Sequence, residues 1–212
     1  MITVTTVMSG FVRQCVAALG VLVALTVVLG VAYPAAVWAV SRVGSNSAEG
    51  SQIVDASGCT VGSSLIGVDP QVPSGRPDPY LHGRVLGSGD DAMATGDPAA
   101  SAASNKGPNN ADLLVWIEQR RTEIAAREAV VPAEVPADAV TGSGSGLDPD
   151  ISPEYAQLQV PRLARENQRS PAEIEKVIDD HTHGRQLGFL GQPRVNVLGV
   201  NLALGHTVAS CP

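Results

Sequence analysis

Large aromatic residues are scarce in this sequence, where Phe, Tyr and Trp make up 3% of 212 residues. Beyond residue 42 the only ones are Tyr80, Trp116, Tyr155 and Phe189. A folded core must therefore be built mostly from Val, Leu, Ile and Ala. The same scarcity disfavours a ligand-binding module with an aromatic-lined pocket.

Basic residues are also few, with 14 Lys and Arg against 21 Asp and Glu, for a formal net charge of −7. The first 42 residues hold two Arg and no acidic residue, and removing this +2 leaves −9 for the rest of the chain. An acidic balance of this size argues against a nucleic-acid partner and against binding to an anionic lipid surface.

Charge is absent from Cys15 to Val40, a run of 26 residues, whereas a helix needs only about 20 apolar residues to cross a bilayer. A cleaved signal peptide has a shorter apolar region and a small-x-small cleavage site. We therefore expect a tail at 1–14, a transmembrane helix at 15–40, a spacer at 41–52 and one soluble domain at 53–212. Arg13 and Arg42 flank the span, so charge does not decide its orientation.

Cysteine is limited to three positions, and Cys15 lies inside the predicted span. Cys59 and Cys211 remain, one near the start of the domain and one near its end. They form either one disulfide or two unpaired thiols, because the Cα separation that decides between these is not encoded locally.

One helix and one segment without regular structure are predicted between residues 111 and 149. Leu113, Leu114, Ile117 and Ile124 recur at helical spacing within 111–130, which predicts a helix with Asn110 as its N-cap. Between 131 and 149 repeated Pro and Gly predict a loop or strand edge without regular structure.

Two more helices are predicted by their start signals. Ser152 followed by Pro153 begins a helix that runs to about Asn167, with a kink or break at Pro161. Ser170 opens a capping box for a helix that ends near His181.

The other segments are less helical. Gly44–Gln52 is small and polar and predicts a flexible spacer, and Gly67–Asn110 is rich in Gly, Pro and Asp and predicts loops. Arg194–Leu204 is rich in β-branched residues and predicts a final strand with a bulge at Gly199. The expected fold is one N-terminal transmembrane helix plus a single mixed α+β domain.

Two groups of residues invite a catalytic or metal-binding interpretation. The loop 142–146 lacks the Gly-Lys-Ser/Thr ending of a P-loop, and Ser143 and Ser145 lack the register of a nucleophile elbow. A membrane-tethered hydrolase using one of these serines with a histidine is the alternative function. His181 and His183 are expected to cap helix carbonyls, so no metal site and no catalytic residue are predicted.

A series of short motifs runs along the domain in a specific order. They are Gly62–Gly67, Tyr80–Arg84, Ala103–Pro108, Ser143–Pro149 with Ile151–Pro153, Gln159–Arg162, His181-Thr182, Gly184-Arg185, Leu187–Gly191 and Pro193–Leu198. Together with the single preceding span, this order resembles the C subunit of the Kdp-type potassium-transporting P-type ATPase.

This resemblance implies a non-catalytic accessory subunit of a high-affinity, ATP-driven potassium uptake complex in the cell membrane. Its implied partners are the lipid bilayer, a potassium-conducting subunit and an ATP-hydrolysing subunit. The sequence has no Asp-Lys-Thr-Gly phosphorylation motif and no P-loop, so a role in assembly is expected and a cofactor of its own is not.

The family is also described as a catalytic chaperone that raises the ATP affinity of the hydrolysing subunit. The resemblance assigns nucleotide contact to Gln159, with Arg162 one turn away, and makes ATP the implied ligand. A single-pass chain with a cytoplasmic N-terminus places its domain outside, away from cytosolic ATP. In that orientation Gln159 packs in the domain or contacts a partner subunit.

Overall fold

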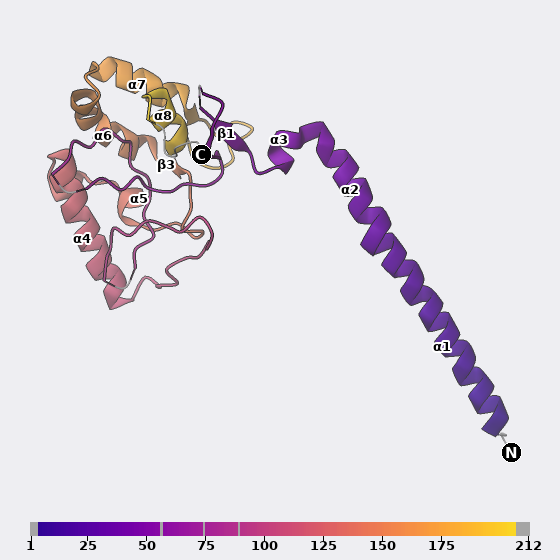
Figure 1. The fold of residues 1–212 in the computed structure, drawn as a ribbon. Helices are drawn as coiled ribbons and strands as arrows, with labels where there is room; N and C mark the ends of the chain where they lie inside the picture. The colour runs from indigo at the N-terminus through magenta and orange to yellow at the C-terminus, as the bar shows by residue number, and fades with distance from the viewer. Residues whose placement is uncertain (1–3, 56, 74, 89, 207–212) are drawn as a thin grey trace. The chain divides into compact units, whose positions relative to one another are not determined.

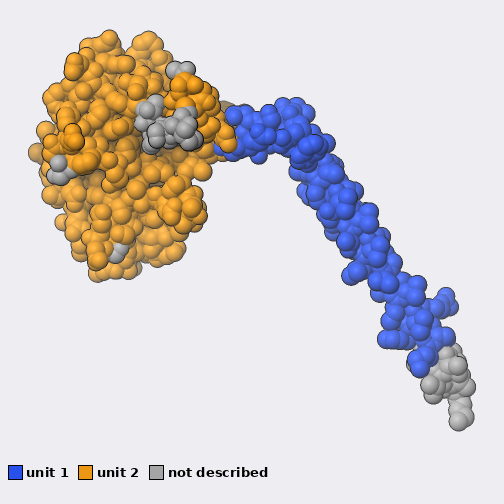
Figure 2. Space-filling model, viewed as in Figure 1, with its two compact units in different colours: residues 1–50 blue, residues 51–212 orange. Residues whose placement is uncertain are grey.

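The computed structural model describes residues 4–206 except 56, 74 and 89. The chain divides into two compact units, Met1–Gly50 and Ser51–Pro212 (Figure 2). Their boundary falls inside the predicted spacer, and each unit is described by itself below.

The first unit is helical from Val4 to Ala48 (Figure 1). Its consecutive segments are α1 (Val4–Val27), the π-helical turn η1 (Val28–Ala32), α2 (Tyr33–Ser41), the 3-10 turn η2 (Arg42–Gly44) and α3 (Ser45–Ala48). Met8–Ala48 is long and apolar enough to cross a membrane, with a mean hydropathy of 2.7 in its most apolar window. The single N-terminal transmembrane helix is thus confirmed.

The prediction of a flexible spacer at Gly44–Gln52 is wrong for its first half, which is helical to Ala48. Arg42 donates from Nη1 to Glu49 Oε1 over 2.7 Å, and the Glu49 N–H donates to the Ser45 carbonyl over 2.8 Å. These two bonds close a helical turn that the local Gly and Ser composition disfavours. Helical structure also begins at Val4, inside the predicted tail.

The domain starts with an antiparallel hairpin of β1 (Gln52–Val54) and β2 (Thr60–Ser63), in which Ile53 faces Gly62. The chain from 64 to 110 then contains no helix or strand at any described residue, which agrees with the loops predicted for 67–110. It is held by close backbone approach: the Gly67 N–H donates to the Leu147 carbonyl over 2.9 Å. A side chain at Gly67 would clash with the Asp148 carbonyl.

Helix α4 (Ala111–Glu128) follows, and Asn110 is its N-cap, accepting from the Leu113 N–H over 3.1 Å. This confirms the predicted helix. Ala129 then ends it in the left-handed region at φ 57°.

The absence of regular structure predicted for 131–149 is wrong, because the segment contains η3 (Pro132–Glu134) and α5 (Ala137–Val140). Pro132 opens the first of these turns, where its missing N–H costs nothing. The Glu134 carboxylate accepts from the Val131 N–H over 3.1 Å and holds that turn.

Helix α6 (Pro153–Glu166) starts at the predicted Ser152 cap and continues through Pro161 as one helix, so the predicted break is absent. Pro161 and Gln157, whose carbonyl loses its backbone donor, both lie on the exposed side of the helix, where water is available to that carbonyl. Helix α7 (Pro171–Asp180) begins at Ser170 with the predicted capping box.

A three-stranded antiparallel sheet joins β3 (Asp150–Ile151), β5 (Arg194–Asn196) and β4 (Thr182–His183) in the order β3-β5-β4. The predicted strand at 194–204 is wrong beyond Asn196, where α8 (Val197–Ala203) begins. The Asn196 side chain accepts from the Gly199 N–H over 2.9 Å. This N-cap bond starts a helix in a segment whose β-branched residues favour a strand.

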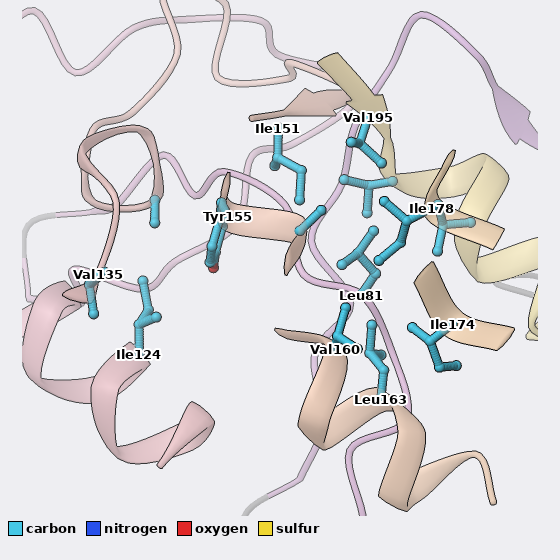
Figure 3. Packing of buried hydrophobic residues seen from close by; sticks show 14 of the residues in the cluster. Leu81, Ile124, Val135, Ile151, Tyr155, Val160, Leu163, Ile174, Ile178 and Val195 are labelled. Atoms are coloured by element: carbon cyan, nitrogen blue, oxygen red, sulfur yellow. The ribbon is translucent and has the colours of Figure 1, made fainter. Parts of the chain in front are cut away.

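One apolar core joins helices α4 to α8 with strands β3 and β5, and Figure 3 shows Leu81 among side chains of α6 and α7. Its buried members are mainly aliphatic, as the composition requires: Leu81, Ile124, Ala125, Val135, Ala139, Val140, Ile151, Tyr155, Ala156, Val160, Leu163, Ala164, Ile174, Ile178, Val195, Val197, Val200 and Leu204. With two small sheets and several helices, the domain is the predicted mixed α+β unit.

Candidate functional site

Two buried side-chain amides hold the extended segment 80–83 inside the domain. Asn201 on α8 accepts from the Leu81 N–H over 2.7 Å and donates to the Leu81 carbonyl over 2.9 Å. Gln159 on α6 accepts from the His82 N–H over 2.8 Å and donates to the His82 carbonyl over 3.0 Å. Each amide therefore pairs with the backbone as a neighbouring strand would.

Arg162 lies one turn after Gln159 and is 3% exposed. Its Nε donates to Glu128 Oε2 and its Nη2 to Gln159 Oε1, both over 2.9 Å. Its Nη1 donates to the carbonyls of Asp78 and Tyr80 over 2.7 and 2.9 Å. The planar guanidinium thus joins α4, α6 and the extended segment in one network.

Glu128, in the last turn of α4, has a fully buried side chain that serves two arginines. Its Oε1 accepts from Arg127 Nε over 2.7 Å, and Arg127 Nη2 donates to the Tyr155 hydroxyl over 2.9 Å. Burial raises the pKa of Tyr155 to about 12, so its hydroxyl stays protonated at neutral pH. Burial lowers the pKa of Arg127, but Tyr155 and Glu128 outweigh it and the net pKa is raised.

The His82 ring lies between two carboxylates. Its Nδ1 is 2.9 Å from Asp69 Oδ2, and its Nε2 is 2.8 Å from Asp78 Oδ2. Burial lowers the pKa of His82, but the charge of the Asp69 carboxylate and the hydrogen bonds to Asp69 and Asp78 together raise it by more, so the net shift is upward. Burial raises the pKa of Asp78, but His82, Arg162 and Arg127 together lower it by more, so its net pKa lies below the usual value. The arrangement favours an imidazolium that donates from both nitrogens.

A pocket of about 230 Å³ opens beside this network, lined in part by Asp69, Asp78, His82, Glu123 and Arg127. Asp78, with 18% of its side chain exposed, is where the network meets solvent. Four of these five charged groups already pair within the domain. The geometry therefore supports a structural role for the cluster.

The structure brings the two candidate nucleotide-binding residues together, but inside the core. Gln159 is 0% exposed and Arg162 is 3% exposed. Their bonds to His82, Glu128 and Asp78 would have to open before either side chain touched a nucleotide. Nucleotide contact by these residues stays a prediction.

The two candidate disulfide cysteines are described only in part. The Cys59 N–H donates to Asp55 Oδ1 over 3.0 Å in the turn between β1 and β2. Cys211 lies outside the described residues, so the Cys59–Cys211 pairing stays a prediction.

The serines of the glycine loop form a turn. Ser143 Oγ and Ser145 Oγ are 3.3 Å apart, and Ser145 Oγ accepts from the Leu147 N–H over 3.1 Å. At the end of α7, His181 Nδ1 lies 2.8 Å from the Val177 carbonyl, which confirms its expected capping role. None of these contacts supports the hydrolase alternative.

Sequence reasoning missed the acidic members of the network, above all Glu128. A signal was present, since Glu128 lies four residues after Ile124 and Arg120 four residues before it, on the apolar face of the predicted helix. Arg120 is 1% exposed, and its guanidinium donates to three backbone carbonyls, those of Leu86, Ala92 and Val140. Burial lowers its pKa.

The loop between β4 and β5 projects apolar side chains. Gln186 and Leu190 exchange two backbone hydrogen bonds of 2.9 Å, which fixes the loop tip. Leu187 is 83% exposed and Phe189 is 68% exposed. This tip is an exposed apolar feature on an otherwise acidic chain.

Comparisons with known proteins give a consistent result. The family model of the K+-transporting ATPase, c chain, matches residues 15–206. The potassium-transporting ATPase KdpC subunit of Streptomyces avermitilis is 46% identical over 204 residues, covering 89% of this chain and 91% of the relative. The KdpC subunits of Kineococcus radiotolerans and Mycobacterium tuberculosis are 43% and 42% identical, covering 93% and 91% of this chain and 95% and 97% of the relatives.

Proposed function

The chain belongs to the K+-transporting ATPase c chain family, and from that premise we propose that it is an accessory subunit on which assembly of a potassium-transporting ATPase depends. Its partners in this proposal are a potassium-conducting subunit, an ATP-hydrolysing subunit and the lipid bilayer. The observation that carries the proposal is the family match, which covers both the apolar helix and the domain.

The buried network supports an accessory role over a catalytic one. Gln159, Arg162, Glu128 and His82 all direct their polar atoms at one another or at the protein backbone. A catalytic group has to reach a substrate atom within hydrogen-bond distance. These side chains act instead as the internal frame of the domain.

We place the domain on the extracytoplasmic side, with the N-terminus in the cytoplasm. The flanking Arg13 and Arg42 are balanced, so this orientation rests on the family resemblance. In this orientation the domain lies against the potassium-conducting subunit and does not meet cytosolic ATP.

An effect on the ATP affinity of the hydrolysing subunit is then indirect. Gln159 and Arg162 support it by shaping the domain, and subunit contacts transmit it. This follows from their burial, since direct contact with a nucleotide would first break the hydrogen bonds that these side chains make to segment 80–83.

The function is tested by preparing the pump with and without this chain. We expect its omission to abolish potassium-stimulated ATP hydrolysis and to reduce recovery of the other two subunits as one complex. Full assembly and full potassium-stimulated activity without the chain would refute the accessory role.

Sidedness is tested by labelling an introduced cysteine, Ser88→Cys, with a membrane-impermeant reagent in intact cells. Ser88 is exposed on the domain, so the label reaches it wherever the domain is outside. The parent chain gives the background from its own cysteines. Labelling that appears only after cell lysis would place the domain in the cytoplasm and restore direct nucleotide contact as the leading mechanism.

A further inference from the structure

The apolar helix changes its hydrogen-bond pattern next to a proline. In η1 the Tyr33 N–H donates to the Val28 carbonyl, five residues back. Pro34 comes next, in the first turn of α2, and has no N–H to donate. Pro34 therefore offers no donor to the Gly30 carbonyl four residues back or to the Leu29 carbonyl five residues back, and at least one of these two carbonyls is left without a backbone donor.

This carbonyl lies deep in the span. Gly30 is 15 residues after Cys15 and 10 residues before Val40, or about 22 and 15 Å along a helix. The hydrocarbon core is about 30 Å thick. Neither lipid tails nor water offer a donor at that depth, where an unsatisfied backbone group is costly.

Among the helix side chains that the structure describes, those nearest this carbonyl do not supply the missing donor. Thr26 donates its hydroxyl to the Leu22 carbonyl over 2.8 Å. Tyr33 is 64% exposed, so its ring points away from the helix. Trp38 lies beneath the Arg42 guanidinium, 5.5 Å from its ring centre, at the far end of the span.

The backbone near this carbonyl is open to a neighbour. A Cβ built on Gly30 would meet only Thr26 Cγ2, at 4.0 Å. Pro34 follows Gly30 by four residues, so Thr26, Gly30 and Pro34 share one side of the helix. We call these three residues the notch.

We propose that a membrane helix of another pump subunit docks at the notch and donates a side-chain hydrogen bond to the carbonyl freed by Pro34. The donor is a hydroxyl or carboxamide, from Ser, Thr, Asn or Gln, because a charged donor is costly at this depth. A second copy of this chain fits less well, since the hydroxyl of its notch is already bonded to Leu22. This inference rests on the proposed function.

The neighbour is identified by photo-crosslinking in the complete pump in a bilayer. A diazirine analogue of leucine replaces Thr26 in the notch, and the control carries it at Val28, on the opposite side of the helix. We expect position 26 to crosslink to another subunit at a several-fold higher yield than position 28. Crosslinks to lipid alone, to a second copy, or equally from both positions would overturn the docking site.

The hydrogen bond is tested with Pro34→Ala, which restores the missing N–H and removes the need for an outside donor. We expect retention of this chain in the detergent-solubilised complex to weaken by about five- to tenfold, the effect of one hydrogen bond between membrane helices. Gly30→Leu blocks close approach and should weaken retention further. Ala32→Leu adds similar bulk at the same depth on the opposite side and should change retention less than twofold.

Retention of Pro34→Ala and Gly30→Leu equal to that of the parent chain would overturn the inference. It would not affect the proposed function, which fails only if the pump assembles and works without the chain. Retention of the two variants therefore tests the docking site, whereas assembly and activity of the pump without the chain test the proposed function.

Discussion

The two units of this chain differ in which side chains they expose and which they bury. Along the helix, side chains such as Leu22 and Val31 are more than 60% exposed, and no residue described there is buried. In the domain, charged groups such as Glu128 and Arg162 are buried, and among described residues no buried side-chain N or O lacks a hydrogen-bond partner. The domain therefore satisfies its buried polar groups internally, whereas the helix depends on lipid and other helices for its contacts.

Glu128→Ala should have the largest effect on the stability of the domain. It leaves Arg127 and Arg162 without their shared carboxylate, and we expect it to lower the free energy of unfolding by about 3–5 kcal/mol. Denaturant titration of the detergent-solubilised full chain measures this. Glu118→Ala, an exposed site on the same helix, should stay within about 0.5 kcal/mol; equal effects would contradict the network's structural role.

Gln159→Ala removes the amide that bonds the His82 backbone and should have the next largest effect on stability. The His82 N–H and carbonyl lose their partner in a buried setting, which we expect to cost about 1–3 kcal/mol of unfolding free energy. Gln157→Ala is the matched control, since Gln157 lies on the same helix but is exposed and bonds Glu175. A stable Gln159→Ala chain in a pump with lowered ATP affinity would support direct nucleotide contact instead.

Ser170→Ala removes the capping box that starts α7. The Ser170 hydroxyl accepts from the Glu173 N–H over 3.3 Å, and Glu173 accepts from the Ser170 N–H over 2.8 Å. We expect a loss of about 1 kcal/mol, measured by the same titration. Ser170→Asp keeps an N-cap acceptor and should restore most of that stability.

The smallest expected effect is a pH dependence of domain stability. Because the pKa of His82 is raised above its usual 6.5, its contribution is full below pH 6.5 and is lost as pH rises through the folded-state value. Because the pKa of Asp78 is lowered from 3.8, its contribution is present above pH 3.8 and is lost on further acidification. His82→Gln should remove the alkaline loss; an unchanged alkaline slope would show that another group causes it.

Local signals predicted much of this fold. Asn110, Ser152 and Ser170 each mark a helix start in the sequence and in the structure, because an N-cap acts within three residues. The segment after Asn196 was misread as a strand, since its β-branched composition outweighed a cap that a single Asn supplies.

The buried network around Arg162 could not be predicted from local sequence patterns. Arg162 joins Asp78 and Glu128, which lie 84 and 34 residues away in the sequence, and no spacing rule links such positions. The family resemblance singled out Gln159 and Arg162 but not their acidic partners. The π-helical turn before Pro34 could not be predicted either, because the sequence does not determine whether each N–H bonds four or five residues back. Only the position of Pro34 could be read from the sequence.

We propose that this chain contributes to assembly of the pump and performs no chemistry of its own. Adding the purified chain back to a pump preparation made without it, and measuring potassium-stimulated ATP hydrolysis, tests this proposal. We expect activity that is absent before addition and saturates at one chain per complex. Full activity before addition, unchanged by the added chain, would contradict it.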